Sequence, residues 1–431
     1  MAKKLHALAV LGLALWKPAT TLATVPKVNN VATSAAAAES VNPVIEWNRS
    51  LLVIVRTPGA QPATIHSTRS FAILHAAVFD AVNAIDRTYI PYAVKLPHVP
   101  RTASIQAAAD EAAHDVLASL YPIFASTLDS ELQQDLDAIP DSQNKTEGIA
   151  VGEAVATAIL ALRGDDGSAA TLPPFTPTNQ PGSYQLTPPN FAPADFIQWS
   201  RVTPFAIASA REFLSAPPPE LTSERYTQSF DEVKSVGLIT STTRTPDQTQ
   251  IGKFWNGNIQ DFWNEIAQTA ALEHQLGIVR SAHLFALLNI SMADTAIAFY
   301  ETKYTYDLWR PVTAIQMAGT DNNPQTEPDT TWAPLSTKTA PDPSYPGAHS
   351  AISTAAGLVL RAILGDQINL GVTSESLPGV TRHFGSFSDA ALEAGLSRIY
   401  AGQHFRFDHE AGERLGERVA YSILRSTLKN R

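Results

Sequence analysis

The sequence predicts an all-α protein whose helices form a bundle-type core with long loops. From Trp47 onward, apolar residues recur at the three- and four-residue spacing of helices that bury one face. No segment shows a convincing run of alternating polar and apolar residues, and no internal repeat is evident. Proline is concentrated in residues 165–224 and 318–346, where it excludes helix interiors. These observations favour helices packed on helices.

The first predicted helices lie in the N-terminal part of the chain. Residues 70–85 are almost wholly apolar, which is typical of a buried helix. Residues 103–121 are rich in alanine, with polar residues on one side, and Gly164 ends the last helix of this part. Two further helices are predicted in this part. One has a leucine face at i, i+4 and i+8, formed by Leu128, Leu132 and Leu136, and the other spans residues 148–163.

Residues 165–224 are predicted to form an ordered excursion over the surface. Their prolines exclude helices, but their aromatic residues give the segment something to bury, which disordered linkers lack. A disordered linker between two domains is the alternative. The aromatic residues are Phe175, Tyr184, Phe191, Phe196, Trp199 and Phe205.

Helices are predicted to resume at Ser223 and to continue to the C-terminus. The last of them carries apolar residues on one face, and Gly412 and Gly416 would let a neighbouring helix approach closely. We expect Asp294, within this part, either to pair with a cation of the candidate site or to be an exposed helix carboxylate. The predicted spans are 254–271, 272–290, 292–302, 349–364, 388–400 and 408–424.

Composition excludes several classes of site. The 431 residues, 44% of them hydrophobic, suffice for one large domain or two smaller ones. The absence of cysteine excludes disulfides, zinc–thiolate sites, iron–sulfur clusters and a cysteine nucleophile. A net charge of −10 predicts that the protein does not bind nucleic acid, so any anionic ligand needs a local cluster of cations.

The N-terminus has the pattern of a secretory signal. Lys3 and Lys4 precede an apolar run, residues 5–16, that is shorter than the about 20 residues that cross a bilayer. We therefore expect residues 1–23 to be a signal peptide and the protein to be secreted or periplasmic, with no transmembrane segment. A ragged N-terminal helix is the alternative. Residues 24–46 are predicted to be a flexible lead-in, and residues 47–431 a single helical domain.

Cations and histidines gather in three short stretches near the C-terminus. Lys303 and Arg310 are two helical turns apart, so they can share one face. His349 follows Pro-Gly-Ala at the start of a predicted helix, whose N-terminal amides favour an anion. His404 and Asp408 are four residues apart, so the carboxylate can orient the imidazole.

Together with Arg398, these residues indicate a site for a tetrahedral oxyanion. Two chemistries are consistent with such a site. One is phosphoryl transfer with a histidine nucleophile and a histidine general acid. The other is permanent binding of a phosphate-shaped oxyanion as a cofactor.

The three stretches resemble the signature motifs of the superfamily that joins vanadium-dependent haloperoxidases, type-2 phosphatidic-acid phosphatases and bacterial acid phosphatases. The motifs K-x6-R-P and S-R-x5-H-x3-D are matched in full by residues 303–311 and 397–408. The motif P-S-G-H is replaced by Pro-Gly-Ala-His at residues 346–349. The apolar segment with His75 and Asp80 is similar to bacterial haloperoxidase-related proteins.

The resemblance implies the helical bundle of that superfamily, with the oxyanion site within residues 303–408. It implies vanadate as the cofactor, with phosphate as a possible substitute, and hydrogen peroxide and halide as substrates. His404 would bind vanadium, Asp408 would fix the His404 tautomer, and His349 would be the acid–base group. The remaining oxyanion-binding residues implied by the resemblance are Lys303, Arg310, Gly347, Ala348 and Arg398.

Two departures from the motifs bear on the activity. Gly347 stands where the family has a serine that donates to the oxyanion, which predicts weaker retention of vanadate. Asp342 stands where related haloperoxidases have an aromatic residue or a histidine near the halide, and a carboxylate pointing inward there would repel halide.

Two other functions stay open. One is a soluble acid phosphatase that cleaves a small phosphate ester with His404 as the phosphorylated nucleophile. The other is a non-catalytic relative that binds the oxyanion only. Related enzymes are often oligomeric, so a homo-oligomer is a further expectation.

Overall fold

The computed structural model describes residues 42–61 and 66–431, and these residues are mostly helical. They form thirteen α-helices and one two-stranded sheet, which confirms the predicted helical fold. The expected signal peptide and most of the expected lead-in lie outside the described residues. The lead-in was expected to extend to residue 46, but α1 (Pro43–Arg56) already begins at Pro43, where the Asn42 side chain caps it.

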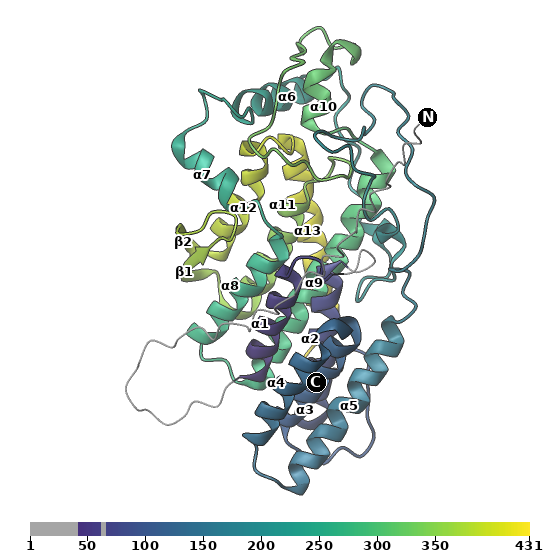
Figure 1. Ribbon diagram of the computed structural model, residues 1–431, viewed down its shortest axis with the longest axis vertical. Coiled ribbons are helices and arrows are strands. Elements are labelled where there is room, and N and C mark those ends of the chain that lie inside the picture. Colours follow the sequence, from purple (N-terminus) through teal and green to yellow (C-terminus); the bar gives the residue numbers. More distant parts are fainter. Residues whose placement is uncertain (1–41, 62–65) are drawn as a thin grey trace, which may run out of the picture. The chain divides into compact units, whose positions relative to one another are not determined.

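The N-terminal helices pack into one group, coloured purple to blue in Figure 1. Here α2 packs against both α3 and α5, which also pack against each other. Helix α2 is buried along nearly its whole length, as its apolar sequence predicts. The bounds are α2 (Ser67–Asp86), α3 (Ile105–Leu120), α4 (Ala125–Asp137) and α5 (Gln143–Arg163).

The proline-rich segment after α5 is ordered and crosses the surface to the second group of helices. It contains only two short 3-10 helices, η2 (Trp199–Arg201) and η3 (Ala210–Phe213). Tyr184 and Trp199 are buried, whereas Phe191 is exposed. Aromatic burial therefore anchors this segment.

A buried carboxylate fixes the end of this segment to α9 (Ile278–Tyr306). Asp294 accepts hydrogen bonds from the backbone N–H groups of residues 205, 206 and 207 at 2.6, 2.7 and 2.9 Å. Asp80 on α2 holds residues 92–94 in the same way. Both expectations for Asp294 were wrong, because the carboxylate is fully buried and its partners are backbone amides.

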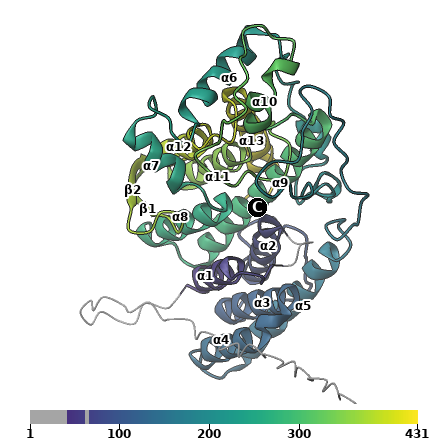
Figure 2. The same ribbon diagram turned by 45° about the horizontal axis from the view of Figure 1, so that its top comes forward.

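The C-terminal helices form the second group, shown from another side in Figure 2. The predicted helix 254–271 begins only at Ile259, after a loop of residues 255–258. The two helices predicted between residues 272 and 302 are one continuous helix, α9. The other bounds are α6 (Glu224–Val236), α7 (Pro246–Phe254), α8 (Ile259–Glu273), α10 (Pro311–Gln316), α11 (Ala348–Leu364), α12 (Phe387–Tyr400) and α13 (Arg406–Ser426).

Helix α9 is the central element of the described chain. It packs against α2 of the first group and against α11 and α13 of the second. Among the described residues, it is the one helix long and apolar enough to cross a membrane. Because 94% of its most apolar window is buried inside the protein, its apolar surface is covered by neighbouring helices, as in a core helix.

A short hairpin was missed by the sequence analysis. Strands β1 (Gln367–Thr373) and β2 (Thr381–Ser386) pair antiparallel, with Leu370 opposite Phe384. Leu370, Val372 and Phe384 are buried on the face toward the helices, while residues between them are exposed. The strands alternate, but only over a few residues, so the pattern is weak beside the long helical periodicities.

Glycines let α13 lie directly on α11. A Cβ atom added at Gly412 would lie 2.4 Å from the carbonyl oxygen of Gly347, and one at Gly416 would lie 2.1 Å from that of Ala351. Any side chain at either position would therefore push the two helices apart. This contact brings the N-terminal ends of α11 and α13 together, which is where the motif histidines lie.

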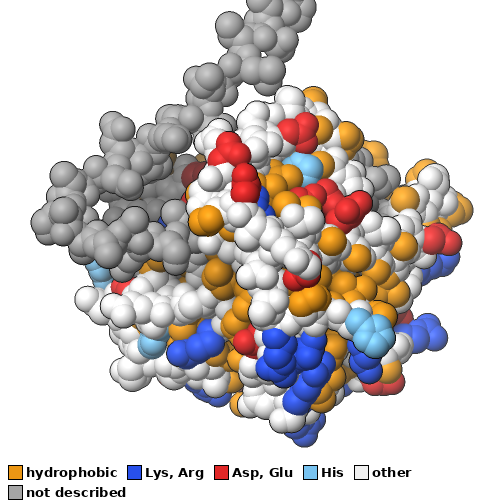
Figure 3. Space-filling model, turned by 90° about the horizontal axis from the view of Figure 1, so that it is seen from below, with side chains coloured by type: hydrophobic (Ala, Val, Ile, Leu, Met, Phe, Trp, Pro, Cys, Tyr) orange, Lys and Arg blue, Asp and Glu red, His pale blue; other side chains and the backbone are white. Residues whose placement is uncertain are grey.

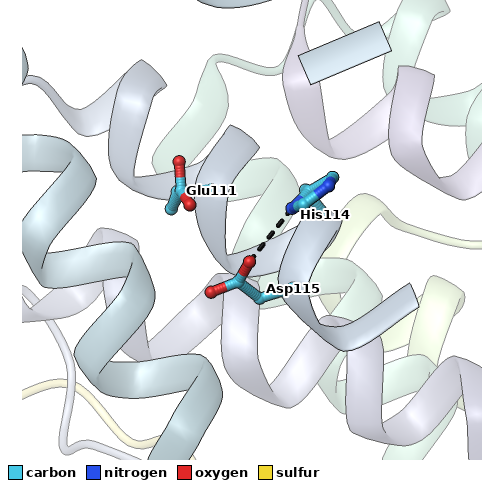
Figure 4. Close-up of side chains that lie close together, drawn as sticks. All are labelled: Glu111, His114 and Asp115. Atoms are coloured by element: carbon cyan, nitrogen blue, oxygen red, sulfur yellow. Dashed lines mark hydrogen bonds and ion pairs between the residues drawn. The ribbon is translucent and has the colours of Figure 1, made fainter. Parts of the chain in front are cut away.

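A histidine–carboxylate cluster lies on α3, away from these motifs (Figure 4). Glu111, His114 and Asp115 are close together, and His114 Nδ1 is 3.0 Å from Asp115 Oδ1. Its Nε2 is 2.8 Å from Oδ1 of Asp129 on α4. Both ring nitrogens thus contact carboxylates, which joins α3 to α4 and raises the pKa of His114. On the face shown in Figure 3, basic side chains lie in several places, with the largest group in the lower middle of the view, among neutral and apolar ones.

We expect His114→Asn to lower the free energy of unfolding by about 0.5–1 kcal/mol at pH 5.5 and by less at pH 8.5. A raised pKa means that the folded state binds the proton more tightly than the unfolded chain. This stabilisation is complete below the ordinary value of 6.5 and is lost as pH rises through the raised pKa. Urea unfolding at both pH values measures the difference. The exposed His274→Asn is the control, and an equal loss at both pH values would contradict the expectation.

Candidate active site

The motif residues lie at the ends of five helices. Lys303 is in the last turn of α9, and Arg310 is the N-cap of α10. His349 is in the first turn of α11, and Arg398 is in the last turn of α12. His404 lies two residues before the start of α13, whose first turn carries Asp408. Because helix ends leave backbone groups unpaired, these positions supply polar contacts as well as side chains.

His404 is held by Asp408 on one side and faces the cations on the other. Its Nδ1 is 3.1 Å from Asp408 Oδ2, and its Nε2 is 3.2 Å from Nη1 of Arg310. Because a carboxylate and a guanidinium are its partners, Nδ1 carries the proton and Nε2 presents a lone pair. Burial, followed by the charges of Arg310 and Lys303, lowers the pKa of His404 well below its usual value. The ring is therefore neutral at neutral pH.

Ser344 fixes Asp408 and was not singled out by the sequence analysis. Its hydroxyl donates to Asp408 Oδ2 at 2.6 Å, and the N–H of Phe405 donates to the same oxygen at 2.9 Å. Asp408 thus caps α13 and orients His404 at once. Burial raises its pKa to about 6, and the hydrogen bonds from Ser344 and Phe405 oppose that rise.

Lys303 and Arg310 are fully buried beside His404. The Lys303 ammonium donates to the carbonyl of Pro343 and lies 3.4 Å from that of Ser344. Arg310 donates to the carbonyl of Gln403 at 3.2 Å. Burial lowers the pKa of Lys303, and the nearby Asp342 opposes that change.

Arg398 completes the cation cluster from α12. Its Nη1 donates to Oδ1 of Asn256 at 3.0 Å, while its buried Nε has no partner among the described residues. Burial and the charge of Arg310 lower its pKa to about 10, so it stays protonated at neutral pH. Asn256 lies in the loop before α8, and no local sequence pattern marks it.

His349 faces the same cluster from α11. Its Nε2 is 3.0 Å from the carbonyl oxygen of Trp255, so this nitrogen donates. Burial and the charges of Arg398 and Arg310 lower its pKa well below the usual value. The structure thus places a second neutral histidine beside the cations.

Asp342 points inward and contacts two of the cations. Its Oδ1 accepts a hydrogen bond from Nη2 of Arg310 and lies 3.6 Å from Nζ of Lys303. Its main-chain oxygen accepts from Nε of Arg310 at 2.7 Å. The carboxylate thus has the inward direction in which it would repel halide.

The second motif, residues 346–349, offers fewer hydrogen-bond donors to an oxyanion than the family pattern P-S-G-H implies. The N–H of Gly347 donates to the carbonyl of Asp408 at 2.9 Å, so its one donor is used within the fold. Ala348 is the first residue of α11, and N–H groups in a first helical turn have no intrahelical acceptor. Ala348 and His349 can therefore still offer backbone donors at the positive end of the α11 dipole.

The donors present fit a tetrahedral oxyanion. Three buried cations face one carboxylate, Asp342, that is ion-paired with two of them, and the Nε of Arg398 lacks a partner. His404 adds an imidazole lone pair at the same point. Fixed cationic donors and one imidazole nitrogen suit vanadate or phosphate better than a free metal cation, which needs anionic or neutral ligands.

Comparisons with known proteins agree with this geometry. Residues 283–430 match the family model of the VCPO second helical-bundle domain. Vanadium chloroperoxidase from Curvularia inaequalis is 24% identical over 349 residues, which cover 60% of this chain and 56% of that protein. The chain thus matches little more than half the length of this curated relative.

Two solved structures extend the similarity over most of the chain. One is a bacterial vanadium-dependent iodoperoxidase, with a TM-score of 0.76 and 26% identity over 90% of this chain and 96% of that one. The other is the holo form of a bacterial vanadium-dependent chloroperoxidase, with a TM-score of 0.65 and 16% identity over 91% and 94%. The second similarity concerns the fold alone.

Fold and site together define a helical-bundle protein with a buried cluster of cations and histidines. The C-terminal bundle matches the VCPO second helical-bundle domain, and the chain has the vanadium haloperoxidase helical fold. The resemblance inferred from the motifs is confirmed.

We expect Ser344→Ala to weaken phosphate binding by about tenfold, because a hydrogen bond to a charged group contributes about 1.5–3 kcal/mol. Without the hydroxyl, Asp408 holds the His404 ring less firmly. Ser344→Thr keeps the hydroxyl and is the matched control. Isothermal titration calorimetry with phosphate measures the affinities, and equal affinities of the alanine and threonine variants would exclude this role of the hydroxyl.

We expect Gly347→Ser to bind vanadate about tenfold more tightly than Gly347→Ala, because only serine adds a donor. A Cβ atom at residue 347 would lie 3.2 Å from the Asp408 carbonyl oxygen and from Ser350 Oγ, so both variants carry the same packing strain. The alanine variant thus separates strain from hydrogen bonding. Equilibrium dialysis with vanadate gives both constants, and no gain for serine over alanine would refute the expectation.

Proposed function

We propose that this protein is a vanadate-dependent haloperoxidase-like enzyme that oxidises halide with hydrogen peroxide to hypohalous acid. The observation that carries the proposal is His404, whose Nε2 lone pair is directed among buried cations while Asp408 holds its other nitrogen. The similarity to a chloroperoxidase and an iodoperoxidase supports the same reaction class.

Bound vanadate would supply Lewis-acid activation of hydrogen peroxide without a change of redox state. The chain would hold its charge with Lys303, Arg310 and Arg398, and His404 Nε2 would be the protein ligand. The amides of Ala348 and His349 would add donors from α11. All of these groups are fixed before binding, so little reorganisation opposes the reaction.

We assign His349 the acid–base role. Because cations and burial depress its pKa, the ring is neutral at neutral pH and can accept a proton. An anion bound among Arg310 and Arg398 would offset their charges and raise the pKa of His349. The residue would then exchange protons within the working pH range, which is what acid–base catalysis requires.

A second function is favoured by one observation, the inward carboxylate of Asp342. Halide at that position would be repelled, whereas a phosphate ester would not need a halide site. With the same residues, His404 would attack phosphorus through Nε2, and His349 would protonate the leaving alcohol. The protein would then be an acid phosphatase.

One experiment separates these functions. The full chain is freed of bound anions and assayed with and without vanadate, both for peroxide-dependent bromination of an acidic diketone and for phosphate release from an aryl phosphate. We expect vanadate-dependent bromination, reduced by at least about a hundredfold in His404→Ala because the protein ligand is lost. His383→Ala, at an exposed histidine of β2, is the control and should keep full activity.

Phosphate release that vanadate inhibits, without bromination, would replace the proposal with the phosphatase. Vanadate binding without either reaction would replace it with a non-catalytic oxyanion-binding protein.

A further inference from the structure

Asp342 places a negative charge in a site whose cationic donors suit a bound anion. Its Oδ1 accepts from Nη2 of Arg310 and lies 3.6 Å from Nζ of Lys303. Both contacts use Oδ1, so Oδ2 keeps its acceptor capacity. A carboxylate here offsets part of the charge of the cations, and its second oxygen can still accept a hydrogen bond.

The backbone fixes this carboxylate in place. The N–H of Asp342 donates to the carbonyl of Ala340 at 2.9 Å, and the carbonyl of Pro341 accepts from Asp195 at 2.8 Å. On the other side, the N–H of Ser344 donates to the carbonyl of Leu308 at 2.8 Å. Asp342 is only 7% exposed, so its charge is poorly screened by solvent.

Tetrahedral oxyanions interact with this carboxylate in two ways, according to whether they are fully ionised or carry a proton. A fully ionised oxyanion, such as sulfate at neutral pH, has only acceptor oxygens, so it would face Asp342 with repulsion and no hydrogen bond. Phosphate and vanadate keep at least one proton at neutral pH. Their hydroxyl can donate to Asp342, which turns the repulsive contact into a charge-assisted hydrogen bond.

We propose that Asp342 makes the site selective for oxyanions that carry a proton, by accepting the hydroxyl of the bound anion and rejecting fully ionised anions. The selectivity is a difference of affinities that arises mainly from the penalty on the wrong ligand. The inference rests on the oxyanion site of the proposed function and concerns inorganic oxyanions, such as phosphate and vanadate, that keep a proton at neutral pH.

The test compares phosphate with sulfate as probes. Isothermal titration calorimetry on the anion-free full chain at pH 7 gives both affinities for the natural protein and for Asp342→Asn. We expect the natural protein to prefer phosphate over sulfate by at least about a hundredfold, since each factor of ten corresponds to about 1.4 kcal/mol. In Asp342→Asn, the amide can donate to sulfate, so the preference should fall to less than about tenfold, mainly through tighter sulfate binding.

Asp195→Asn is the matched control. It removes one negative charge from the neighbourhood of Asp342, but its contact with residue 341 is through the backbone. We expect it to keep the preference for phosphate. Asp342→Glu retains a carboxylate and should keep it too, and Asp342→His provides a second neutralised variant if Asp342→Asn fails to fold.

An unchanged preference in the neutralised variants would overturn the inference, as would an equal loss of preference in Asp195→Asn. Failure of every variant to bind either anion would overturn the oxyanion site itself. Selective binding that depends on Asp342, found together with no bromination and no phosphate release, would support the inference and contradict the proposed function.

Discussion

The site depends on the burial of three like charges close together. Lys303, Arg310 and Arg398 repel one another in a place where solvent cannot screen them, which burial makes costly. The fold offsets this cost mostly with neutral oxygens, including the carbonyls of Pro343 and Gln403 and the amide of Asn256. Such acceptors orient the cations without neutralising them. The cluster keeps a net positive character, which suits an anion.

The arrangement of helices serves this cluster. Helix ends supply unpaired backbone groups, and five of them converge because α9, α11, α12 and α13 pack closely. The approach of α13 to α11 needs Gly412 and Gly416, whose added Cβ atoms would strike the α11 backbone. Asp294 on α9 anchors the proline-rich segment, because it accepts hydrogen bonds from the backbone of that segment. Long loops at this end are therefore structural parts of the site.

Sequence patterns located most of the fold and the motif residues, because both depend on local spacing. Helical periodicity does not depend on partners, and Lys303, Arg310, Arg398 and His404 stand in fixed motifs. The features that the sequence analysis did not predict are set by tertiary contacts. No local pattern shows that residues 278–306 form one uninterrupted helix, that Asn256 accepts from Arg398 across 142 residues, or that Asp294 binds backbone amides. The position of Asp342 was identified, but its inward direction follows only from the packing of residues 340–344.

The two histidines differ in their hydrogen bonds, and this difference supports the different roles proposed for them. The cluster depresses the pKa of both rings, so composition and charge alone do not distinguish them. His404 has a carboxylate on Nδ1, which holds the proton there and directs the Nε2 lone pair at the cations. His349 has backbone partners, Trp255 and Gly257, and no carboxylate holds its ring in one protonation state. A ligand must stay deprotonated at the binding nitrogen, and an acid–base group must not be fixed in one state. The Asp408 carboxylate, present for one ring and absent for the other, would therefore be the physical origin of the roles proposed for the two histidines.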